Sequence, residues 1–292
     1  NAGINVSKYD LFAAIDVDCI LEYESLLKMV KPFMEERSNS EVIAVGGVVR
    51  IANSCEVKDG KIIRVNLPKQ LLPRVQVLEY IRAFLLGRMA WSRLNGLILI
   101  SGAFGLFDKK IAIAAGGYNH KTVGEDMELV IRMRRYMEEL GKDYKVVYLP
   151  DPLCWTEAPS SMKILSKQRN RWTRGTIETL LLHKRLIFNP RYGFLGMVSM
   201  PFWFLFEWMA PIVEALALFY LIIMLFLGIL NQEMFITLFL TVYAFAILYS
   251  TGAILFEEFS YHQYKRKIDI LRLLGTAIIE PIFIHPINVY NA

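Results

Sequence analysis

Cysteine and histidine are scarce in this chain of 292 residues. The three cysteines, Cys19, Cys55 and Cys154, are widely spaced and form no Cys-x-x-Cys pair, which argues against a disulfide framework and against a zinc site. The four histidines show no spacing typical of metal ligands. This cysteine usage fits a polar region that faces a reducing, cytosolic environment.

Charge is also sparse, and it is unevenly placed. Charged residues make up 21% of the chain and hydrophobic residues 54%, with a mean hydropathy of +0.35, which is too apolar for an ordinary soluble domain. The net charge of +5 is modest, and the basic residues are not interleaved with aromatic ones, so nucleic-acid binding is not favoured. Charges concentrate before residue 191, which predicts a polar block followed by an apolar block in lipid.

The polar block has the pattern of an α/β domain. Short runs of apolar or β-branched residues predict strands at 11–15, 41–53, 61–66 and 145–149, the first of them buried on both faces. Asp59-Gly60 predicts a hairpin turn, and Pro150 and Pro152 are expected to end the last strand. Helical periodicity covers 71–95 and 125–140, and Gly141 is expected to end the second helix.

Two aspartates follow the first predicted strand. Asp16 and Asp18 come directly after the apolar run 11–15. Ligands of open α/β sheets bind at the carboxyl ends of strands, where alternate carboxylates can hold Mg²⁺ or Mn²⁺ against a diphosphate. Taken alone, the two acids are more typical of a solvated loop, so their assignment depends on the later motifs.

A third acidic signal opens the helix predicted at 125–140. Asp126 lies in its first turn, where the helix dipole favours the charged carboxylate. It is either a simple N-terminal cap or a general base, exposed at the helix tip and directed outward toward an acceptor hydroxyl. Glycosyl transfer requires such a base, but the residue alone does not decide between the two roles.

Gln168, Arg171 and Trp172 have the spacing i, i+3, i+4 and therefore share one face of a helix. Arginine offers a fork that matches phosphate oxygens, glutamine can donate or accept, and the indole gives a flat surface suited to a sugar ring. The same residue types are typical of an amphipathic helix at a membrane interface. The two interpretations are compatible.

With these motifs in this order before a hydrophobic tail, the chain resembles processive, membrane-embedded family-2 glycosyltransferases. These are the cellulose, hyaluronan, chitin and poly-N-acetylglucosamine synthases. The resemblance covers residues 1–190 by motif and the tail by hydropathy only. It implies an α/β, glycosyltransferase-A-like catalytic domain with a partial mixed sheet, followed by interfacial helices and transmembrane helices.

The resemblance also implies roles for individual residues. Asp126 matches the catalytic base, in a Gly-Glu-Asp version of the family's acidic motif. Asp16 and Asp18 match the DxD pair that binds the nucleotide diphosphate and its metal, Mg²⁺ or Mn²⁺. The other implied substrate-binding residues are Glu125, Ser101 and Gly102 in an acceptor-lining segment, and Gln168, Arg171 and Trp172 of the QxxRW motif.

The resemblance is incomplete at the start of the chain. In the family, base-binding strands and a Lys-Ala-Gly segment precede the DxD strand, and Asn1-Ala2-Gly3 matches only the end of that segment. The uridine pocket is therefore expected to be absent from these residues, either through truncation or because another polypeptide supplies it. The chain alone is expected to bind a UDP-sugar poorly and to catalyse no transfer.

The apolar block predicts about three membrane spans. Residues 194–230 would extend roughly 55 Å as a helix, which exceeds one crossing and falls short of two. Basic residues flank the block at 184–191 and 265–267 but are missing from 231–233, so the positive-inside rule places 231–233 away from the cytoplasm. The expected spans are 211–230, 234–256 and 268–287, with 194–208 interfacial or re-entrant and broken at Pro201 and Pro211.

Three acids lie in this apolar sequence: Glu207, Glu214 and Glu280. A carboxylate at bilayer depth is costly, which favours a polar path such as a glycan channel. A position of Glu207 and Glu280 at the headgroup level explains them equally well.

The predicted domains are a partial catalytic domain at 1–157, interfacial helices with the QxxRW motif at 158–209, and transmembrane helices at 210–292. The expected function is inverting transfer of a sugar from a UDP-sugar to a growing β-linked glycan, with the catalytic domain on the cytosolic side of the plasma membrane. The expected partners are the UDP-sugar, a glycan acceptor, the lipid bilayer and a missing half or partner subunit, with no nucleic acid. A non-processive lipid glycosyltransferase and a catalytically silent, glycan-binding membrane component are the alternatives.

Overall fold

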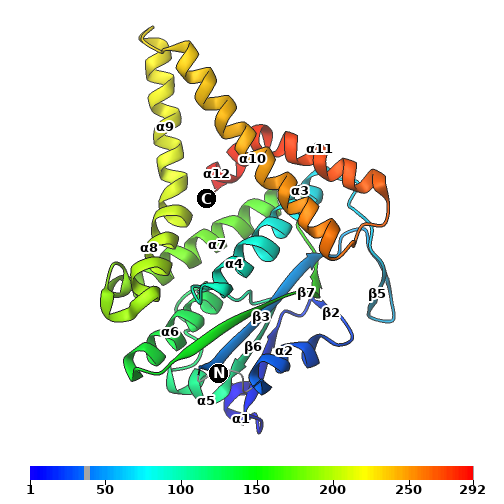
Figure 1. Ribbon diagram of the computed structural model, residues 1–292, viewed down its shortest axis with the longest axis vertical. Coiled ribbons are helices and arrows are strands. Elements are labelled where there is room, and N and C mark those ends of the chain that lie inside the picture. The colour runs from blue at the N-terminus through cyan, green and yellow to red at the C-terminus, as the bar shows by residue number, and fades with distance from the viewer. Residues whose placement is uncertain (36–39, 292) are drawn as a thin grey trace.

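The computed structural model describes residues 1–35 and 40–291; residues 36–39 and 292, in the first and last predicted domains, lie outside this description. A mixed sheet lies at one end of the molecule and a pair of long apolar helices projects from the other (Figure 1). Five strands pair in the order β1-β6-β3-β7-β2. Their bounds are β1 Leu11–Ile15, β2 Ile20–Leu21, β3 Glu41–Ile51, β6 Phe104–Asp108 and β7 Tyr144–Thr156.

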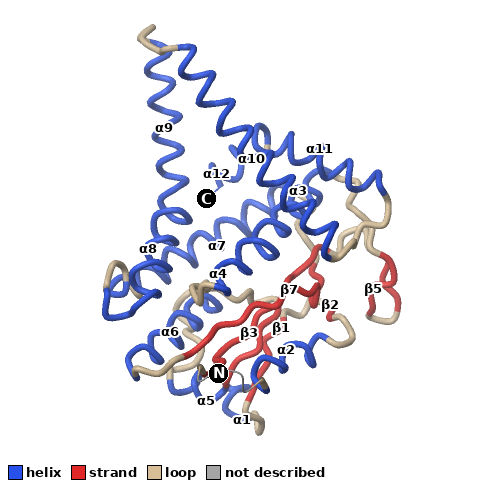
Figure 2. The backbone as a smooth tube through the Cα atoms, viewed as in Figure 1, coloured by secondary structure: helices blue, strands red, loops and turns tan. Residues whose placement is uncertain are grey.

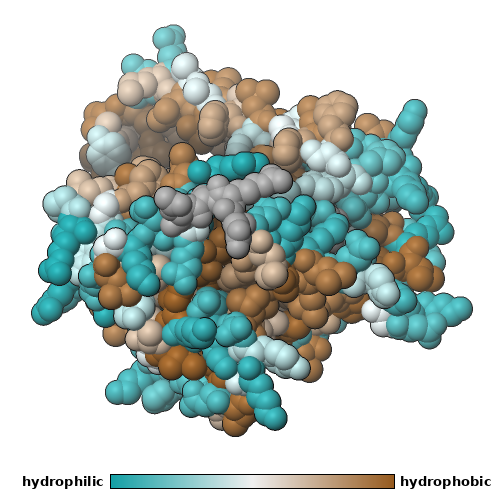
Figure 3. All heavy atoms as spheres, turned by 60° about the horizontal axis from the view of Figure 1, so that its bottom comes forward, coloured by the Kyte–Doolittle hydropathy of each residue, from teal (hydrophilic) through white to brown (hydrophobic). Residues whose placement is uncertain are grey.

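Strand β1 lies at the edge of this sheet. Among the described residues it pairs with β6 alone, antiparallel, and its own residues are half-buried or exposed. The prediction of a strand buried on both faces is therefore wrong, because an apolar run does not tell a central strand from an edge strand. Apolar side chains elsewhere in this half are also exposed, among them Val6, Leu27 and Met34. Figure 3 views this end of the molecule and shows hydrophobic surface between the hydrophilic side chains.

Strand β7 runs through the prolines that were expected to end it. It pairs in parallel with β3 from Tyr144 to Thr156, with shifts in register around Val48. A proline cannot donate to the ladder, but a β-bulge tolerates it. Strand β2 pairs with β7 only at residues 154 and 155, so most of β7 has no partner strand on that side among the described residues. The predicted break at Pro150 and Pro152 is therefore wrong, and the strand continues through a bulge.

Helices cover both sides of the sheet (Figure 2). Helix α2 (Ser25–Met34) packs on β3 and β7. Helix α3 (Leu71–Tyr80) packs on β3 and α4 (Arg88–Arg93) on β7, and the π-helical turn Ile81–Gly87 joins the two helices. The predicted hairpin is confirmed as β4 (Glu56–Lys58) and β5 (Lys61–Arg64), with positive φ at its turn. The remaining helices of this half are α1 Ala2–Val6, α5 Lys109–Ala114, α6 Glu125–Leu140 and α7 Met162–Leu182.

Two helices are long and apolar enough to cross a membrane. Leu195–Phe226 has 32 residues, which include α8 (Met200–Phe202) and α9 (Met209–Phe226), and α10 (Gln232–Ser260) has 29. They form a hairpin whose turn lies farthest from the sheet (Figure 1). Large apolar side chains stand exposed along it, such as Phe219 and Phe226, as lipid contact requires.

The first of these helices is unbroken, contrary to the predicted interruption at Pro201 and Pro211. A π-helical turn precedes each proline, at Leu195–Ser199 and at Trp203–Trp208. The wider π turn moves the preceding carbonyl groups, with which a proline ring clashes in a regular α-helix. The helix therefore accommodates both prolines.

Ion pairs join the sheet half to the apolar half. Arg82 donates to Glu280 over 3.1 Å, and buried Arg50 of β3 pairs with buried Glu257 of α10. Glu280 lies on α11 (Lys267–Phe283), which has 17 residues and precedes α12 (His285–Asn291). Helix α11 is not one of the two candidate spans, and the third span stays a prediction. The ion pair of Glu280 with Arg82 also offsets the free-energy cost of placing a carboxylate in this apolar block.

Candidate functional site

The two aspartates of the DxD motif lie just beyond the end of β1, at the edge of the sheet. The Asp16 backbone N–H donates to the carbonyl of Ala103 over 3.3 Å, and Asp18 accepts from the Thr156 hydroxyl over 3.4 Å. Both side chains are exposed. The aspartates thus stand at the junction of β1, the loop before β6 and the end of β7.

Electrostatics places Asp16 within a cluster of acids. Partial desolvation by the surrounding protein raises the pKa of Asp16, the charges of Asp18 and Asp126 raise it further, and Arg171 opposes them. Residues separated by more than 100 positions therefore act on one carboxyl group. The cluster carries more negative than positive charge, an arrangement that favours a bound cation.

Asp126 is held in place by the loop that precedes β6. The backbone N–H of Gly102 donates to Asp126 Oδ2 over 3.0 Å, and the N–H of Met127 donates to Oδ1 over 2.7 Å. The side chain is half-buried, which corrects the prediction of a carboxylate exposed at the helix tip. The difference arises because the Ser101–Gly102 segment folds over the start of α6. A carboxylate fixed by two N–H groups is well placed to act on a neighbouring hydroxyl.

The helix that carries the QxxRW motif packs against the start of α6 through two glycines. A Cβ atom on Gly175 would lie 2.8 Å from the Gly124 Cα, and one on Gly124 would lie 2.7 Å from the Gly175 carbonyl oxygen. Glu178, one turn further along α7, accepts from the Val123 N–H over 3.1 Å. These contacts fix the distance between Asp126 and the motif helix. Sequence reasoning missed the glycine pair, since nothing in either segment signals its partner.

Gly175→Ala is expected to destabilise the protein by about 1–3 kcal/mol, because the added methyl group meets backbone that cannot move aside. It should also lower the rate of transfer, since a shift of about 1 Å at a reacting group costs up to about 100-fold. Thermal unfolding and initial rates measure both effects. Gly275→Ala, in a helix with no atom within 4 Å of the new Cβ, is the matched control and should unfold like the wild type or later. Wild-type stability and rate in Gly175→Ala would contradict the prediction.

Gln168, Arg171 and Trp172 lie on α7, as the spacing predicts, and the same stripe continues to Gly175. Arg171 is exposed and acts on Asp16 electrostatically. Trp172 is 39% exposed, and the Arg169 guanidinium stacks over its ring at 5.0 Å. Arg169 is itself paired with Glu79. The Arg169 guanidinium therefore holds the indole in one orientation, and the exposed part of the ring is accessible to a ligand.

A buried hydrogen bond strengthens the same helix contact. Glu128 of α6 accepts from Arg132 and lies 3.1 Å from His183 Nε2, and both Glu128 and His183 are buried. Burial alone would raise the pKa of Glu128, but the hydrogen bonds from His183 and Arg132 outweigh it and hold the pKa below its usual value. The start of α6 is thus anchored to the end of α7.

Tyr118 and a thiol pair are residues of this site that sequence reasoning did not select. Burial raises the pKa of Tyr118, and the charges of Asp126, Glu125 and Asp16 add to the effect, which places the phenol among the acids. The Cys19 thiol donates to Asp18 Oδ1 over 3.8 Å and the Cys154 thiol to the Ala103 carbonyl over 3.9 Å, and the interaction between the two thiols lowers the pKa of Cys19 and raises that of Cys154. All three cysteines are free thiols. No sequence motif marks these residues.

The chemistry of the acids fits a divalent metal, although three protein ligands do not converge. No group of three or more His, Cys, Asp or Glu side chains among residues 1–35 and 40–291 could hold a metal ion. Asp16 and Asp18 offer hard carboxylate oxygens, and neither has an ion pair among the described residues. Mg²⁺ and Mn²⁺ accept few protein ligands when a substrate diphosphate completes the shell.

Comparison with known proteins identifies the family of this chain. The sequence profile of the glycosyl transferase family group 2 matches residues 69–253. The chain belongs to this family. The matched region of this family member contains Ser101, Gly102, Glu125, Asp126, Gln168, Arg171 and Trp172, whereas Asp16 and Asp18 precede it.

The family member is similar to two curated synthases. The poly-β-1,6-N-acetyl-D-glucosamine synthase of Staphylococcus epidermidis is 26% identical over 181 residues, and that of Staphylococcus aureus is 28% identical over 183 residues. In each case the match covers 62% of this chain and 38% of the relative. The chain thus spans about two fifths of the length of these synthases.

A solved structure shares its fold. The mannosyltransferase of Pyrobaculum calidifontis in complex with GDP-Man and Mn²⁺ matches with a TM-score of 0.52 at 14% identity, covering 97% of this chain and 65% of that one. The fold is therefore glycosyltransferase-A-like with a partial mixed sheet, followed by a helical C-terminal region, which confirms the predicted fold class.

Proposed function

We propose that this protein is an inverting glycosyltransferase that moves a sugar from a UDP-sugar to a growing β-linked glycan. One observation carries the proposal: adjacent residues of one loop hold Asp16 and Asp126, through Ala103 and Gly102, and the charges of Asp18 and Arg171 act on the same group. Two carboxylates for a diphosphate-bound cation, a third for proton removal and an arginine for phosphate oxygens are the groups that this reaction requires. Family membership and the similarity to polysaccharide synthases support the assignment.

Asp126 is the proposed general base. The acceptor hydroxyl attacks the anomeric carbon of the donor, the bond from that carbon to the diphosphate breaks, and the hydroxyl proton passes to Asp126. The Gly102 N–H, at 3.0 Å from Oδ2, orients the carboxylate for this step. Arg171 faces the acidic cluster and would bind phosphate oxygens of the leaving UDP, while the exposed ring surface of Trp172 would stack on the acceptor sugar.

Asp16 and Asp18 are the proposed ligands of Mg²⁺ or Mn²⁺. When bound, such an ion would stabilise the negative charge of the departing diphosphate. The Mn²⁺ in the complex of the Pyrobaculum calidifontis mannosyltransferase supports a divalent cation for this fold. Glu125, Gln168 and Ser101 are proposed to contact substrate around these groups.

Product analysis tests the function. A version of the protein completed with the nucleotide-binding half that is expected to be missing from these residues, purified in detergent with Mn²⁺, is incubated separately with UDP-N-acetylglucosamine, UDP-glucose and GDP-mannose, and products are separated by size and by organic extraction. A polymer made from a UDP-sugar is expected, with UDP-N-acetylglucosamine the first donor to try because the related synthases make its polymer. Transfer of one sugar to lipid would favour the lipid-glycosyltransferase alternative, and binding without transfer would favour the silent component.

The proposed location is the plasma membrane, with the sheet half on the cytosolic side. The part of the helix Leu195–Phe226 that follows residue 209 and helix α10 would cross the bilayer, and residues 158–209 would lie along its cytosolic surface. Both ends of this helical hairpin lie toward the sheet half (Figure 1). The basic residues at 184–191 and 265–267 would then share the cytosolic side, in agreement with the positive-inside rule.

A cysteine at Asn231 is expected to react with a membrane-impermeant thiol reagent applied to intact cells, whereas a cysteine at Arg266 is expected to be protected. The physical reason is that Asn231 lies in the turn of the hairpin and Arg266 follows its cytosolic end. Labelling is measured in a background with the three native cysteines replaced by serine. Arg266 should become reactive after the cells are permeabilised, which serves as the control. The reverse pattern of labelling would invert the proposed orientation.

A further inference from the structure

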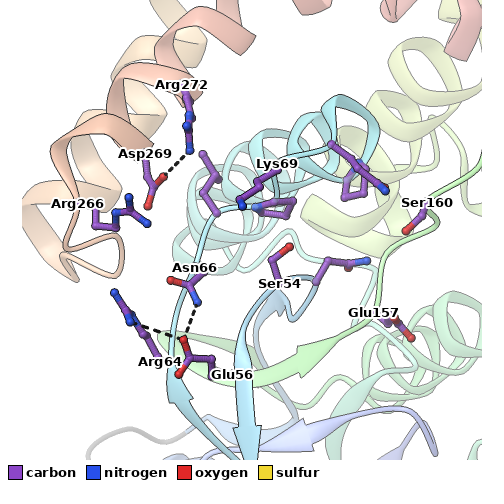
Figure 4. Close-up of a pocket in the computed structure, with 15 residues that line it drawn as sticks. Ser54, Glu56, Arg64, Asn66, Lys69, Glu157, Ser160, Arg266, Asp269 and Arg272 are labelled. Atoms are coloured by element: carbon purple, nitrogen blue, oxygen red, sulfur yellow. Dashed lines mark hydrogen bonds and ion pairs between the residues drawn. The ribbon is translucent and has the colours of Figure 1, made fainter.

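A cavity lies between the sheet half and α11. It has a volume of about 680 Å³ and is formed by the β4–β5 hairpin, the segments that follow β3 and β7, and the first residues of α3 and α11 (Figure 4). We call it the hairpin pocket. None of Asp16, Asp18 and Asp126 lines it. Its size suits a small ligand, and its lining is mostly polar.

Positive charge exceeds negative charge in the hairpin pocket. Four cationic side chains line it against three carboxylates, which leaves one net positive charge: Arg64, Lys69, Arg266 and Arg272 against Glu56, Glu157 and Asp269. Two of the carboxylates are already neutralised, because Glu56 pairs with Arg64 at 3.6 Å and Asp269 with Arg272 at 3.4 Å.

Two cations remain available. Lys69 and Arg266 have no ion-pair partner among residues 1–35 and 40–291, although both reach the same cavity. Glu157, the third carboxylate, lies at the opposite side of the pocket from Arg266 (Figure 4). The part of the pocket between the hairpin and α11 therefore holds uncompensated positive charge.

The N-terminal ends of two helices add to the positive electrostatic potential of the pocket. Helices α3 and α11 both begin at the hairpin pocket, and neither has a side-chain hydrogen bond at its N-cap, Gln70 or Arg266. Free N–H groups at a helix start favour an anion. Nearby, Arg74 and Arg272 lie close enough that burial and the Arg272 charge lower the pKa of Arg74. Like charges are thus crowded on this side of the fold, which an anion would relieve.

We propose that the hairpin pocket binds a phosphate group, with Lys69 and Arg266 as its principal contacts. The group could belong to a soluble phosphate compound or to the headgroup of an anionic lipid, because α11 follows directly on the cytosolic end of the proposed span α10. The site is separate from the donor site and requires no divalent metal. Occupancy would join the hairpin to α11, and so the sheet half to the apolar half.

Calorimetric titration with inorganic pyrophosphate tests the proposal, on the protein in phospholipid-free detergent with EDTA present to prevent metal-dependent binding at the DxD motif. Saturable binding is expected, and Lys69→Gln with Arg266→Gln should weaken it about tenfold or more, as expected when two charge-assisted contacts are lost. Lys58→Gln with Lys61→Gln is the matched control, since it removes two exposed charges from the same hairpin outside the pocket. The control should change the affinity less than about twofold.

Three further measurements test where pyrophosphate binds and which source supplies the phosphate group. Asp18→Asn should bind pyrophosphate like the wild type, because its carboxylate lies outside the pocket. In nanodiscs, phosphatidic acid should compete with pyrophosphate if the bilayer supplies the group and should leave the affinity unchanged if a soluble phosphate is the ligand, with phosphatidylcholine nanodiscs as the control. Lys69→Arg with Arg266→Lys should restore binding. Absence of saturable binding, equal losses in the two double variants, or loss in Asp18→Asn would overturn the proposal whether or not the protein transfers sugar.

Discussion

Asp126→Asn is expected to lower the rate of sugar transfer by about 10²–10⁴-fold, the usual contribution of a general base. An asparagine cannot take up the acceptor proton, yet its side-chain oxygen can still accept from the Gly102 N–H that now holds Oδ2. The fold and the binding of donor should therefore persist. Initial rates and UDP binding with Mn²⁺ are the two measurements, made on the same preparation of the protein completed with its nucleotide-binding half.

Glu139→Gln is the matched control for this variant. Glu139 lies on the same helix and is half-exposed, and its exposed ion pair with Arg135 contributes little to stability. It should retain the wild-type rate. An Asp126→Asn protein that keeps a third of its activity would show that another group removes the proton.

The helical motifs were predictable because their signals are local. The spacing of Gln168, Arg171 and Trp172 is sufficient to place them on one face of α7, and Gly141 ends α6 with a φ of 64°. Side chains three and four apart on a helix share a face whatever surrounds them. These parts of the fold needed no knowledge of tertiary structure.

The errors occurred where a distant segment decides the outcome. Pro150 and Pro152 read as the end of a strand, but the bulged pairing of β7 with β3 continues past them. The burial of Asp126 depends on the Gly102 loop, and the approach of α7 depends on Gly124 opposite Gly175. A single sequence contains no record of such pairs, because the spacing along the chain, about 50 positions for the glycines, follows no local period.

Asp18→Asn is expected to weaken metal-dependent UDP binding by about 10–100-fold, since even the loss of a supporting group at a metal site has an effect of that size. The amide removes a charged ligand but can still meet the Thr156 hydroxyl, so the end of β7 should stay in place. Free Mn²⁺ is followed by electron paramagnetic resonance in the presence of UDP, and transfer is measured across a range of Mn²⁺ concentrations.

The pattern of rescue separates the two aspartates. Higher Mn²⁺ should restore part of the activity of Asp18→Asn and none of that of Asp126→Asn, because only the first variant limits metal binding. Asp10→Asn is the matched control: Asp10 precedes the opposite end of β1, its side chain is 83% exposed, and it should leave Mn²⁺ affinity unchanged. If Asp18→Asn and Asp126→Asn lower UDP affinity equally, the three acids act as one electrostatic unit and the division into metal ligands and base is wrong.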